Sequence, residues 1–575
     1  MIVQELHRIQ HEHGYLPDHE LRSLSDRTGT PLYRLQEVSS FFPHFLREPP
    51  PTIEVNICRD MTCHLRGSDK MIEAVQALPE CDGKNLHVAG VSCLGRCDRA
   101  PVTRIGHHNY MRSTSSEVVE LVQQVLAGGH PAADTDEAYT DLSAGWDIDV
   151  YNGKPEYHAV RAYCEAEDRD AERERIISSL ETANLLGMGG AGGRAYKKWR
   201  DVFNAIGTTK YVVVNGDESE PGTFKDRELL LRTPHLTLEA VILAGLVLGA
   251  KRGYIYIRHE FEEQIDSCRR AIKASEEAGY SGEDVLGTGM DMTVEVFVSP
   301  GGYICGEQTA LIEAMEDKRA EPRNRPPELQ TNGLWDKPTL LNNVETMAWV
   351  PSIVTKDEGQ WFADRGKPGY KGKRFFSISG DLEKPGPYEV PIGITLGEMI
   401  TDFCGGMKDG QEMKAFAPSG PSGGFLPRML PIEYVGKRFA DTLPEGTTHF
   451  DIWDWQLDIG LSRQMGLMMG AGMVVYGENA DMVEQALACL KFYRAESCGK
   501  CVPCRIGSQK LVDLGTRVHR QEFDNDGLAK TKDLVEELAE VMEITAICGL
   551  GTVAPNPLRT LLRHFPDELE RYTKK

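Results

Sequence analysis

The spacing of apolar and polar residues divides this chain of 575 residues into segments with different periodicities. Residues 1–48 repeat apolar positions at helical spacing, as in ELHRIQHEHGYLP, and are predicted to form short helices. From TIEVNIC (52–58) onward, strand-like and helical patterns alternate until SEVVELVQQVL ends near residue 127. Residues 1–127 are therefore predicted to form a helical cap and a small α/β unit.

A stretch rich in Gly, Pro, Ala and Asp, residues 128–153, is predicted to be a linker. Beyond it, the apolar runs YVVVN (211–215), GYIYIR (253–258) and VEVFVS (294–299) have the length of buried strands, and helical segments alternate with them. Residues 154–370 are therefore predicted to form a doubly wound α/β domain.

Two further patterns complete the chain. Strand-like RFFSIS, the turn EKPGP and the short helical stretch TLGEMITDFC predict a compact α+β module over residues 371–455. The remaining residues, 456–575, have mainly helical spacing. The expected fold class is a multidomain α/β protein that ends in a helical bundle.

Charge and hydropathy narrow the possible functions. With a formal net charge of -23 and no block of Lys or Arg, the chain lacks the basic surface that binds nucleic acid. Its first residues are amphipathic and do not form a signal peptide, and the apolar run LTLEAVILAGLVLGA (236–250) is too short to cross a bilayer. We therefore expect a soluble cytoplasmic protein with reduced cysteines, in which cysteines at ligand spacing bind metal.

Three cysteines near the end of the chain have the spacing of cluster ligands. Cys498, Cys501 and Cys504 form a C-x2-C-x2-C motif, and Cys548 follows a helical stretch that can return it to the other three. Zinc ribbons usually contain two C-x2-C pairs, whereas three close cysteines and one remote cysteine suit a 4Fe–4S cluster. The pattern therefore predicts a 4Fe–4S cluster.

A second set of cysteines lies on two loops of the amino-terminal α/β unit. Four residues separate Cys58 from Cys63 in CRDMTC, and three residues separate Cys93 from Cys97 in CLGRC. This spacing fits a 2Fe–2S cluster with two thiolates for each iron, and a tetrahedral zinc site is the alternative. The other cysteines lack ligand spacing and are predicted to be buried apolar side chains.

A glycine-rich stretch, LLGMGGAGGRAYKKW, is a candidate cofactor loop. It contains Gly187-x-Gly189-x-x-Gly192 but follows a helical segment, so the usual context of a Rossmann fingerprint is missing. Its backbone N–H groups can still approach a phosphate or a flavin ring, and Lys197 and Lys198 can neutralise the phosphate. A plain flexible turn is the alternative.

Polar residues follow the predicted strands, at the edge where doubly wound sheets bind their ligands. YVVVN runs into GDESEPGTFKDR, which brings Asn215, Asp217, Glu218 and Glu220 to the end of a strand. GGYICGEQTAL follows another strand, and LNNVET supplies two adjacent amides that can hydrogen-bond a polar ring edge or a ribityl chain. A solvated acidic loop is the alternative.

These motifs, in this order and together with KPTLLNNVET, ESCGKCVPC and ICGLG, extend over nearly the whole chain. They resemble a fusion of the two peripheral NADH-oxidising subunits of respiratory complex I, a thioredoxin-like 2Fe–2S subunit and a flavoprotein with FMN and a 4Fe–4S cluster. The order also resembles the diaphorase subunits of NAD-reducing hydrogenases. In layout it is most similar to the beta subunit of NAD-dependent molybdenum or tungsten formate dehydrogenases.

The resemblance implies a thioredoxin-like domain in 1–127, a Rossmann-like FMN domain in 154–370, a β-grasp module in 371–455 and a bundle with the 4Fe–4S cluster in 456–575. It implies FMN, both clusters and NAD as cofactors, and no catalytic acid or base. The residues implied in cofactor binding are Gly187, Gly189, Gly190, Gly192, Lys198, Asn215, Asp217, Glu218, Tyr303, Gly306, Glu307, Gln308, Asn342 and Asn343. The implied metal ligands are Cys58, Cys63, Cys93, Cys97, Cys498, Cys501, Cys504 and Cys548.

The resemblance also implies an NADH:acceptor oxidoreductase. Hydride would pass between nicotinamide and flavin, and electrons would then move singly through the clusters to a partner subunit. The chain has no molybdopterin or nickel signature of its own, so formate dehydrogenase, hydrogenase or related catalytic chemistry would reside on that partner. Two alternatives remain: an electron relay on the same scaffold that uses a protein or quinone partner in place of NAD, and a zinc-bound structural subunit.

The chain departs from the family pattern on the nucleotide side of the expected flavin site. The family usually reads GRGGAGFPTG where this chain has GMGGAGGRAY, so Met188, Gly193 and Arg194 replace Arg, Phe and Pro, and Gln308 replaces a Glu. We expect Arg194 to restore the lost positive charge and Tyr196 to supply the lost stacking surface, which would preserve NAD binding. In the alternative, nucleotide binding has been lost.

Overall fold

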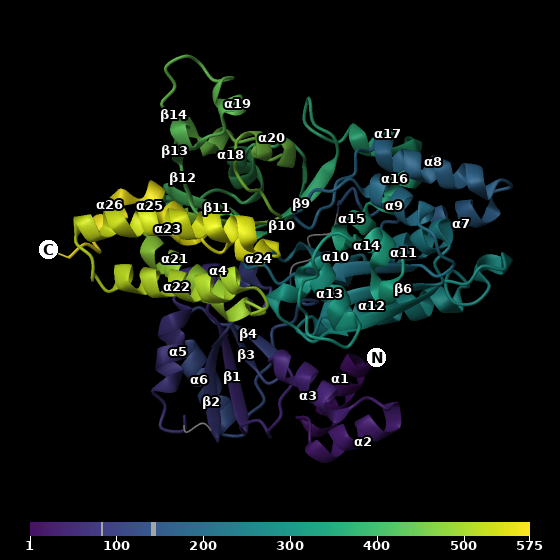
Figure 1. The fold of residues 1–575 in the computed structure, drawn as a ribbon, viewed down its shortest axis with the longest axis horizontal. Helices are drawn as coiled ribbons and strands as arrows, with labels where there is room; N and C mark the ends of the chain where they lie inside the picture. The colour runs from purple at the N-terminus through teal and green to yellow at the C-terminus, as the bar shows by residue number, and fades with distance from the viewer. Residues whose placement is uncertain (82–83, 140–144, 575) are drawn as a thin grey trace.

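The structure is a computed structural model that describes residues 1–81, 84–139 and 145–574 (Figure 1). The predicted linker, residues 128–153, lies only partly within this range, because residues 140–144 fall outside it. In Figure 1 the purple amino-terminal unit lies beneath both the teal domain that is predicted to bind FMN (the FMN domain) and the yellow carboxy-terminal helices. The amino-terminal unit can therefore contact both.

The amino-terminal unit has a helical cap followed by a thioredoxin-like sheet, as predicted. Its strands lie in the order β2-β1-β3-β4, with β1 parallel to β2 and antiparallel to β3. Its elements are α1 (Ile2–His13), α2 (Asp18–Thr28), α3 (Leu32–Phe41), β1 (Ile53–Cys58), α4 (Met61–Leu65), α5 (Ser68–Gln76), β2 (Leu86–Val91), β3 (Val102–Ile105), β4 (His108–Met111) and α6 (Ser115–Leu126). Alternate apolar residues of β1 pack with apolar residues of α5 and α6 in one core.

The FMN domain is a doubly wound α/β unit with parallel strands in the order β7-β6-β5-β8. Its main elements are α7 (His158–Glu165), α8 (Arg169–Thr182), α9 (Ala195–Asn204), β5 (Tyr211–Gly216), α10 (Lys225–Arg232), α11 (Pro234–Leu248), β6 (Arg252–Arg258), α12 (Glu262–Glu277), β7 (Thr293–Ser299), η3 (Tyr303–Gly306), α13 (Gln308–Met315), α14 (Leu329–Asn332), β8 (Thr339–Asn343), α15 (Val344–Ala348), α16 (Val350–Thr355) and α17 (Gln360–Ala363). The apolar runs of β5, β6 and β7 form strands as expected.

The next sheet has the strand order β10-β9-β15-β11-β12. Its elements are β9 (Lys373–Gly380), β10 (Gly386–Pro391), α18 (Leu396–Glu398), β11 (Met413–Pro421), β12 (Leu426–Pro427), α20 (Ile459–Gln464) and β15 (Gly472–Gly477). The sequence pattern did not separate β15 from the mainly helical segment around it. All six residues of β15 are buried, and a short strand buried on both faces has no alternation that distinguishes it from a helix.

The carboxy-terminal bundle follows β15 and carries the second set of cysteines. Its helices are α21 (Met482–Glu496), α22 (Val502–His519), α23 (Asn525–Thr545), α24 (Gly549–Val553), α25 (Asn556–His564) and α26 (Pro566–Glu570). Among the described residues no single helix is long and apolar enough to cross a membrane, and only α10 and α11, bent by 87° at their junction, pass that test as a pair.

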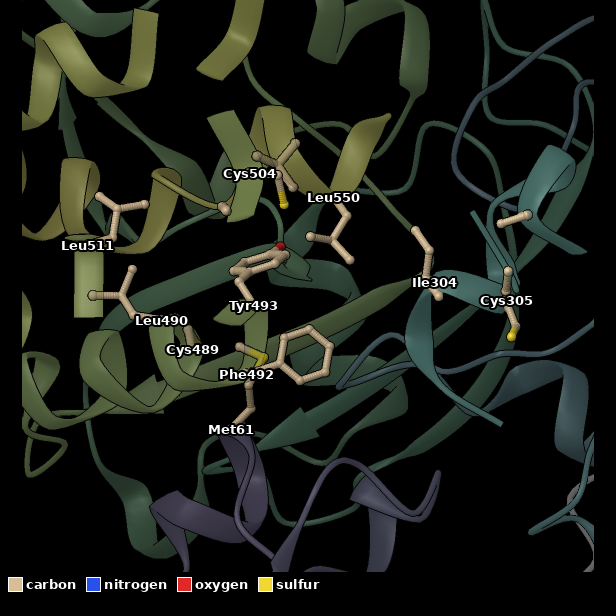
Figure 2. Close-up of a cluster of buried hydrophobic side chains, with 14 of the residues drawn as sticks. Met61, Ile304, Cys305, Cys489, Leu490, Phe492, Tyr493, Cys504, Leu511 and Leu550 are labelled. Atoms are coloured by element: carbon tan, nitrogen blue, oxygen red, sulfur yellow. The ribbon is translucent and has the colours of Figure 1, made fainter. Parts of the chain in front are cut away.

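One hydrophobic core joins three of these units (Figure 2). Met61 of α4 lies on one side of Phe492, Tyr493 of α21 lies at the centre, and Cys504 of α22 lies above it. Ile304 of η3 reaches the same core from the FMN domain. Because these five side chains are almost fully buried, the amino-terminal unit, the FMN domain and the bundle pack as one body.

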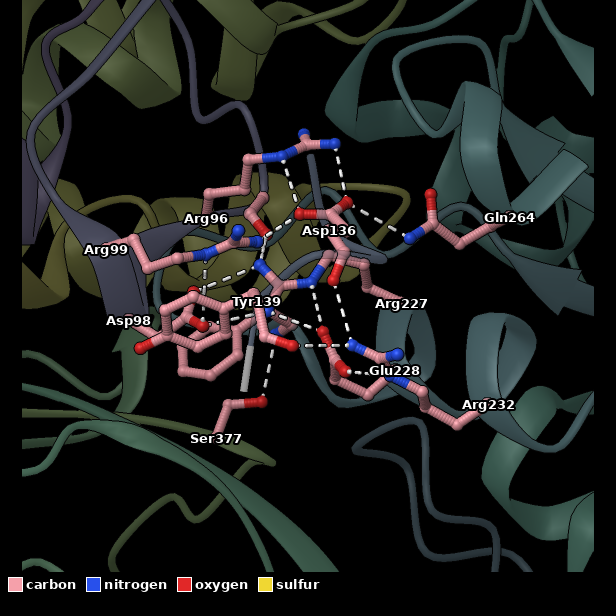
Figure 3. Close-up of polar contacts among 12 residues, drawn as sticks. Arg96, Asp98, Arg99, Asp136, Tyr139, Arg227, Glu228, Arg232, Gln264 and Ser377 are labelled. Carbon is pink, nitrogen blue, oxygen red and sulfur yellow. Dashed lines mark hydrogen bonds and ion pairs between the residues drawn. The ribbon is translucent and has the colours of Figure 1, made fainter. Parts of the chain in front are cut away.

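A buried ionic network also holds the amino-terminal unit on the FMN domain (Figure 3). Arg227 of α10 donates to both carboxylate oxygens of Asp98, at 3.0 and 2.8 Å, and to the carbonyl oxygen of Gly95 at 2.8 Å. Arg96 donates to both oxygens of Asp136, at 3.1 and 2.7 Å. The loop that carries Cys93 and Cys97 is thereby fixed against α10.

Candidate functional site

Strand register brings two predicted amides together at the carboxyl edge of the FMN-domain sheet. Asn215 at the end of β5 pairs with Asn343 at the end of β8. The Asn215 Nδ2 donates to the carbonyl oxygen of Gly306 at 2.9 Å, which ties this edge to the segment after β7. Asn343 caps α15, and its Nδ2 donates to Asp226 Oδ2 at 2.6 Å. Three of the predicted FMN-binding residues therefore meet at one edge.

The acidic residues that follow β5 are buried and hydrogen-bonded. Asp217 accepts hydrogen bonds from Ser219 Oγ at 2.6 Å and from Ser299 Oγ at 3.2 Å, and burial raises its pKa to about 7. Glu218 accepts two backbone N–H groups at the start of α10, at 2.7 and 2.8 Å, and burial also raises its pKa. At neutral pH this edge is therefore less negative than its sequence suggests, which favours an anionic cofactor.

The glycine-rich loop lies between α8 and α9 and packs closely on its surroundings. A side chain at Gly189 would lie 3.2 Å from the Cβ of Asn343, so glycine permits the close approach to the amide edge. Gly190 and Gly192 have φ of 103° and 61°, and a Cβ at Gly192 would lie 2.6 Å from Ile459. The backbone of the loop lies beside the amides, and its role as a cradle for the cofactor stays a prediction.

A lysine and an amide line the same region beneath the loop. Lys198 Nζ donates to the carbonyl oxygen of Leu341 in β8 at 3.1 Å. Burial and the nearby charge of Arg325 lower the Lys198 pKa to about 8. Asn342 is buried, and its Nδ2 lies 3.6 Å from the sulfur of Met347, a weak acceptor. Lys198 can therefore act as a phosphate ligand whose charge depends on pH.

The residues after β7 contribute a helix start. Glu307 caps α13 by accepting two backbone N–H groups at 2.9 Å each, and its other oxygen accepts from Arg325 Nη2 at 2.9 Å. Gln308 is the first residue of α13 and is partly exposed. The backbone N–H of Tyr303 donates to Glu496 at 2.8 Å. Glu307 is therefore engaged with protein groups, while Gln308 is available to a ligand.

On the nucleotide side of the predicted flavin site, the residues that differ from the family pattern differ in burial and in contacts. Gly187 N–H donates to the carbonyl oxygen of Gly193 at 2.7 Å, which closes the loop. Met188 is buried, so it does not replace the positive charge of the family's arginine. Arg194 is exposed, and its Nη1 donates to the hydroxyl of Tyr196 at 3.3 Å. The Arg194 guanidinium and the Tyr196 ring, which are expected to bind the nucleotide, therefore lie together at the edge of the loop.

The first cysteine set converges. Cys93 and Cys97 sulfurs are 3.4 Å apart, and Cys58 interacts with both Cys63 and Cys93 through its thiol. Hydrogen bonds from the Cys58 and Cys97 thiols hold the pKa of Cys93 well below its ordinary value. The N–H of Gly222, in the loop after β5, donates to the Cys97 sulfur at 3.3 Å. These four thiols meet directly beside the loop that carries Asp217.

The second set also converges, at the start of α22. Burial and the charges of Cys501 and Cys498 raise the pKa of Cys504, while a hydrogen-bonding contact with Ser497 at 3.2 Å opposes the shift. Burial raises the pKa of Cys548 to about 12, and the charge of Cys498 contributes. α23 thus brings Cys548 close enough to interact electrostatically with Cys498, and the ligand set of four thiols stays a prediction.

Both sets are suited to clusters by their donor chemistry, because each offers four thiols and every cysteine that the structure describes is free. As the side chains stand, no group of three or more His, Cys, Asp or Glu side chains among the described residues could hold a metal ion. The assignment of individual ligands therefore stays a prediction that rests on spacing and on thiol proximity.

Two residues of this site were not predicted from the sequence. Arg325 lies in a proline-rich stretch, and only the fold brings it to Glu307 and Lys198. Glu496 accepts from Ser92 Oγ at 2.5 Å as well as from the Tyr303 N–H, so one carboxylate joins three parts of the chain that are remote in sequence. An ionisable residue shows such a role only in three dimensions.

Three family models match this chain in the order of its domains. Residues 1–126 match the thioredoxin-like [2Fe-2S] ferredoxin, residues 180–352 the Nuo51 FMN-binding domain, and residues 484–572 the NADH-ubiquinone oxidoreductase-F iron-sulfur binding region. These matches define an iron–sulfur flavoprotein, with FMN, a 2Fe–2S cluster and a 4Fe–4S cluster as cofactors and NAD as substrate. The cofactor prediction is confirmed.

Similar proteins extend this assignment. The F subunit of the NADH-quinone oxidoreductase of Aquifex aeolicus is 37% identical over 436 residues, which cover 73% of this chain and 93% of that protein. The HoxS alpha subunit of the NAD-reducing hydrogenase of Cupriavidus necator is 29% identical over 588 residues, 98% of this chain and 91% of that protein. A crystal structure of an NAD+-reducing [NiFe]-hydrogenase in the H2-reduced state aligns with a TM-score of 0.81 and 27% identity, covering 100% of this chain and 92% of that one.

The chain therefore belongs to the family that comprises the F subunits of NADH-quinone oxidoreductases and the related diaphorase subunits. The predicted family, fold class and enzyme class, an oxidoreductase that depends on flavin and iron–sulfur clusters, are confirmed. The similarity to the beta subunit of formate dehydrogenase stays a prediction.

We expect Lys198, the predicted ligand of the FMN phosphate, to make FMN binding dependent on pH. Its pKa of about 8 leaves it neutral above that pH in the flavin-free protein, so binding the cofactor phosphate must then take up a proton. FMN affinity is expected to fall by up to about tenfold for each pH unit above pH 8. Quenching of FMN fluorescence by flavin-depleted protein measures this slope. Lys198→Met should bind FMN more weakly and without the slope, whereas Lys197→Met, which changes the exposed neighbour, should keep it. A wild-type affinity independent of pH up to pH 10 would remove Lys198 from the phosphate site.

Proposed function

We propose that this chain is the cytoplasmic diaphorase subunit of a multisubunit redox complex, exchanging electrons between NAD(H) and a partner subunit that carries the substrate chemistry. The observation that carries the proposal is the position of the predicted flavin edge between two converging cysteine sets. The loop after β5 touches Cys97 through the N–H of Gly222. On the other side, Tyr303 packs against Phe492 of α21, just before the second set begins at Cys498.

The described residues prepare the site for this role in three ways. FMN, when bound, exchanges a hydride with NAD(H) and passes electrons on one at a time. The glycine loop and Lys198 would hold its phosphate, and Asn215, Asn342 and Asn343 would hydrogen-bond its polar edge and chain. Buried Asp217, with its pKa raised to about 7, limits repulsion of that phosphate. No side chain needs to act as a catalytic acid or base.

The bundle offers an exit for electrons to a partner. Val502 and Ile506 of α22 are each 59% exposed, and Val541 and Ile544 of α23 are 53% and 75% exposed. α22 and α23 pack together, and these apolar side chains lie at the end of the helix pair next to Cys501 and Cys548. An exposed apolar group of this kind marks a protein contact. We therefore place the partner subunit over this end of the bundle, and a formate dehydrogenase catalytic subunit remains our preferred partner from the layout of the chain.

An electron relay without NAD is the second candidate, because the chain lacks the family's aromatic residue at Gly193. Anaerobic titration of the oxidised protein with NADH separates the two. We expect the flavin to bleach at micromolar NADH, within the range of affinities that dehydrogenases show for their substrates. If the flavin is present and no bleaching occurs even at millimolar NADH, the relay is correct and the diaphorase proposal fails.

The same titration tests the expected role of Tyr196. If its ring supplies an aromatic contact of about 1 kcal/mol, Tyr196→Ala should weaken NADH about fivefold without loss of FMN. Tyr196→Phe keeps the ring and removes only the hydroxyl that accepts from Arg194, so it should bind NADH nearly as the wild type does. Equal affinity in all three proteins would show that the ring does not contact the nucleotide.

A further inference from the structure

A cavity of about 700 Å³ lies between the FMN domain and the sheet of β9, β10 and β15. Its wall includes Gly187 and Met188 at the start of the glycine loop, and Asp458 and Leu461 from the α20 region. The described residues that line it do not include Lys198, Asn215 or Asn343, so it meets the predicted flavin and nucleotide site only at Gly187 and Met188. A volume of this size accommodates a small organic molecule.

The cavity wall contains a buried arginine with an incomplete set of partners. Arg374, the second residue of β9, is only 5% exposed. Among the described residues, no acceptor lies within hydrogen-bonding distance of its Nε. Its guanidinium lies over the ring of Phe376, 4.5 Å from the ring centre, and no carboxylate of the described residues forms an ion pair with it. A permanently charged group in this position is unfavourable unless an anion joins it.

The two nearest carboxylates are already engaged. Glu345 pairs with Lys225 Nζ at 3.0 Å and accepts the N–H of Phe375 at 2.6 Å. Asp458 caps α20 by accepting the N–H of Leu461 at 2.7 Å. Burial lowers the pKa of Arg374. The negative charges of Glu345 and Asp458 act in the opposite direction, but only as electrostatic effects through space. Arg374 therefore lines the cavity, and its buried Nε has no acceptor among the described residues.

We propose that this cavity is a second small-molecule site, which binds an organic anion through the guanidinium of Arg374. A carboxylate or a phosphate fits equally, because both accept two parallel N–H groups from one guanidinium. The aromatic walls at Phe362 and Tyr370, together with Leu461, suit a flat or apolar body on the same ligand. Gly187 and Met188 belong to both the cavity wall and the glycine loop. A ligand in this cavity would therefore contact the backbone that is predicted to hold FMN.

The test uses the complete, FMN-loaded protein and two probes with the same ring, phenyl phosphate and benzoate, with uncharged phenol as the third. Calorimetric titration should show binding of at least one anion with a Kd of about 1 mM or tighter, and no binding of phenol. The stronger anion identifies the phosphate or carboxylate class. If neither anion binds at concentrations up to about 10 mM, the proposal is overturned.

Two variants locate the binding. Arg374→Met should weaken the stronger probe by about tenfold or more, because hydrogen bonds to a charged group are lost. Leu461→Trp keeps the arginine but narrows the cavity, and should also weaken binding, which keeps the test valid if Arg374→Met folds poorly. Arg428→Met is the matched control, since Arg428 lies on the same module and pairs with Glu412 at 2.9 Å on the surface. Unchanged affinity in both cavity variants would place the probe elsewhere and overturn the proposal.

A second measurement separates a ligand site from a structural arginine. Without probe, the thermal midpoint of Arg374→Met should equal or exceed that of the wild type, because an unpaired buried charge has been removed. A saturating concentration of the probe should raise the thermal midpoint of the wild type and leave that of the variant unchanged. A variant that is less stable without probe, and unaffected in its binding, would show that the guanidinium serves the fold alone.

Discussion

Cys501→Ser is expected to remove about four of about six irons from each chain and to leave the 2Fe–2S centre in place. Cys501 is the N-cap of α22 and is half-buried among three other thiols that converge from the start of α22 and from Cys548. Loss of one thiolate leaves a 4Fe–4S cluster without a full ligand set. Because Cys58, Cys63, Cys93 and Cys97 lie in a different domain, their two irons should be retained. Iron analysis and low-temperature EPR of the reduced protein measure both populations.

Cys81→Ser is the matched control, because Cys81 is also a half-buried free thiol but lacks ligand spacing. It should retain the wild-type iron content. Iron unchanged in Cys501→Ser would remove Cys501 from the ligand set. Zinc in place of iron in the wild type would instead restore the alternative of a zinc-bound structural subunit.

Sequence periodicity predicted the helices and strands that have one apolar and one polar face, and the strands that consist of a long apolar run. It identified β5, β6 and β7, because each is an apolar run bounded by turn residues. It did not assign β8, because Thr339–Asn343 is short and ends in two amides. Residues Gly472–Gly477 were taken with the helical segment around them, because a fully buried strand shows no alternation. Both strands are specified by pairing with neighbours that are remote in sequence.

The same distinction applies to the site. Cysteine spacing and the order of motifs were sufficient to predict the cofactors, because thiolate ligands require particular residues at particular separations. The partners of buried charges could not be predicted. Arg325 and Arg374 belong to no motif, Glu496 begins the cysteine motif without being a ligand, and each depends on a contact between segments that the chain brings together only when folded. Departures from a family pattern, such as Met188, become interpretable only once burial is known.

Removal of a buried arginine is expected to affect stability differently at two places in this molecule. Arg374 lacks an acceptor among the described residues, so its removal should not destabilise the empty protein. Arg227 is fully buried and has its acceptors from Gly95, Asp98 and Glu228. The difference matters for electron transfer, because the loop that Arg227 holds also carries Cys93 and Cys97. The arginine therefore fixes the position of the predicted 2Fe–2S site relative to the predicted flavin edge.

Arg227→Met should lower the free energy of unfolding of the amino-terminal unit by about 3–5 kcal/mol, because a partner of a buried ion pair is removed and a charge is left behind. The remaining cation near Asp98 is Arg99, whose Nε is 3.6 Å from Asp98 Oδ2. Urea denaturation followed by the visible absorbance of the 2Fe–2S centre measures the loss. The double variant Arg227→Met with Asp98→Asn removes the unpaired charge as well, and it should recover more than half of the stability.

The control is Arg428→Met, which removes an arginine that pairs with Glu412 at the surface and should change stability by less than about 1 kcal/mol. The comparison of the single and double variants distinguishes an ionic role from a packing role. If Asp98→Asn adds a further loss to Arg227→Met in place of a recovery, the arginine stabilises the interface through its packing and its bond to Gly95, and the buried charge pair is not the cause. If Arg227→Met is as stable as the wild type, the hydrophobic core around Tyr493 and Met61 alone holds the amino-terminal unit in position.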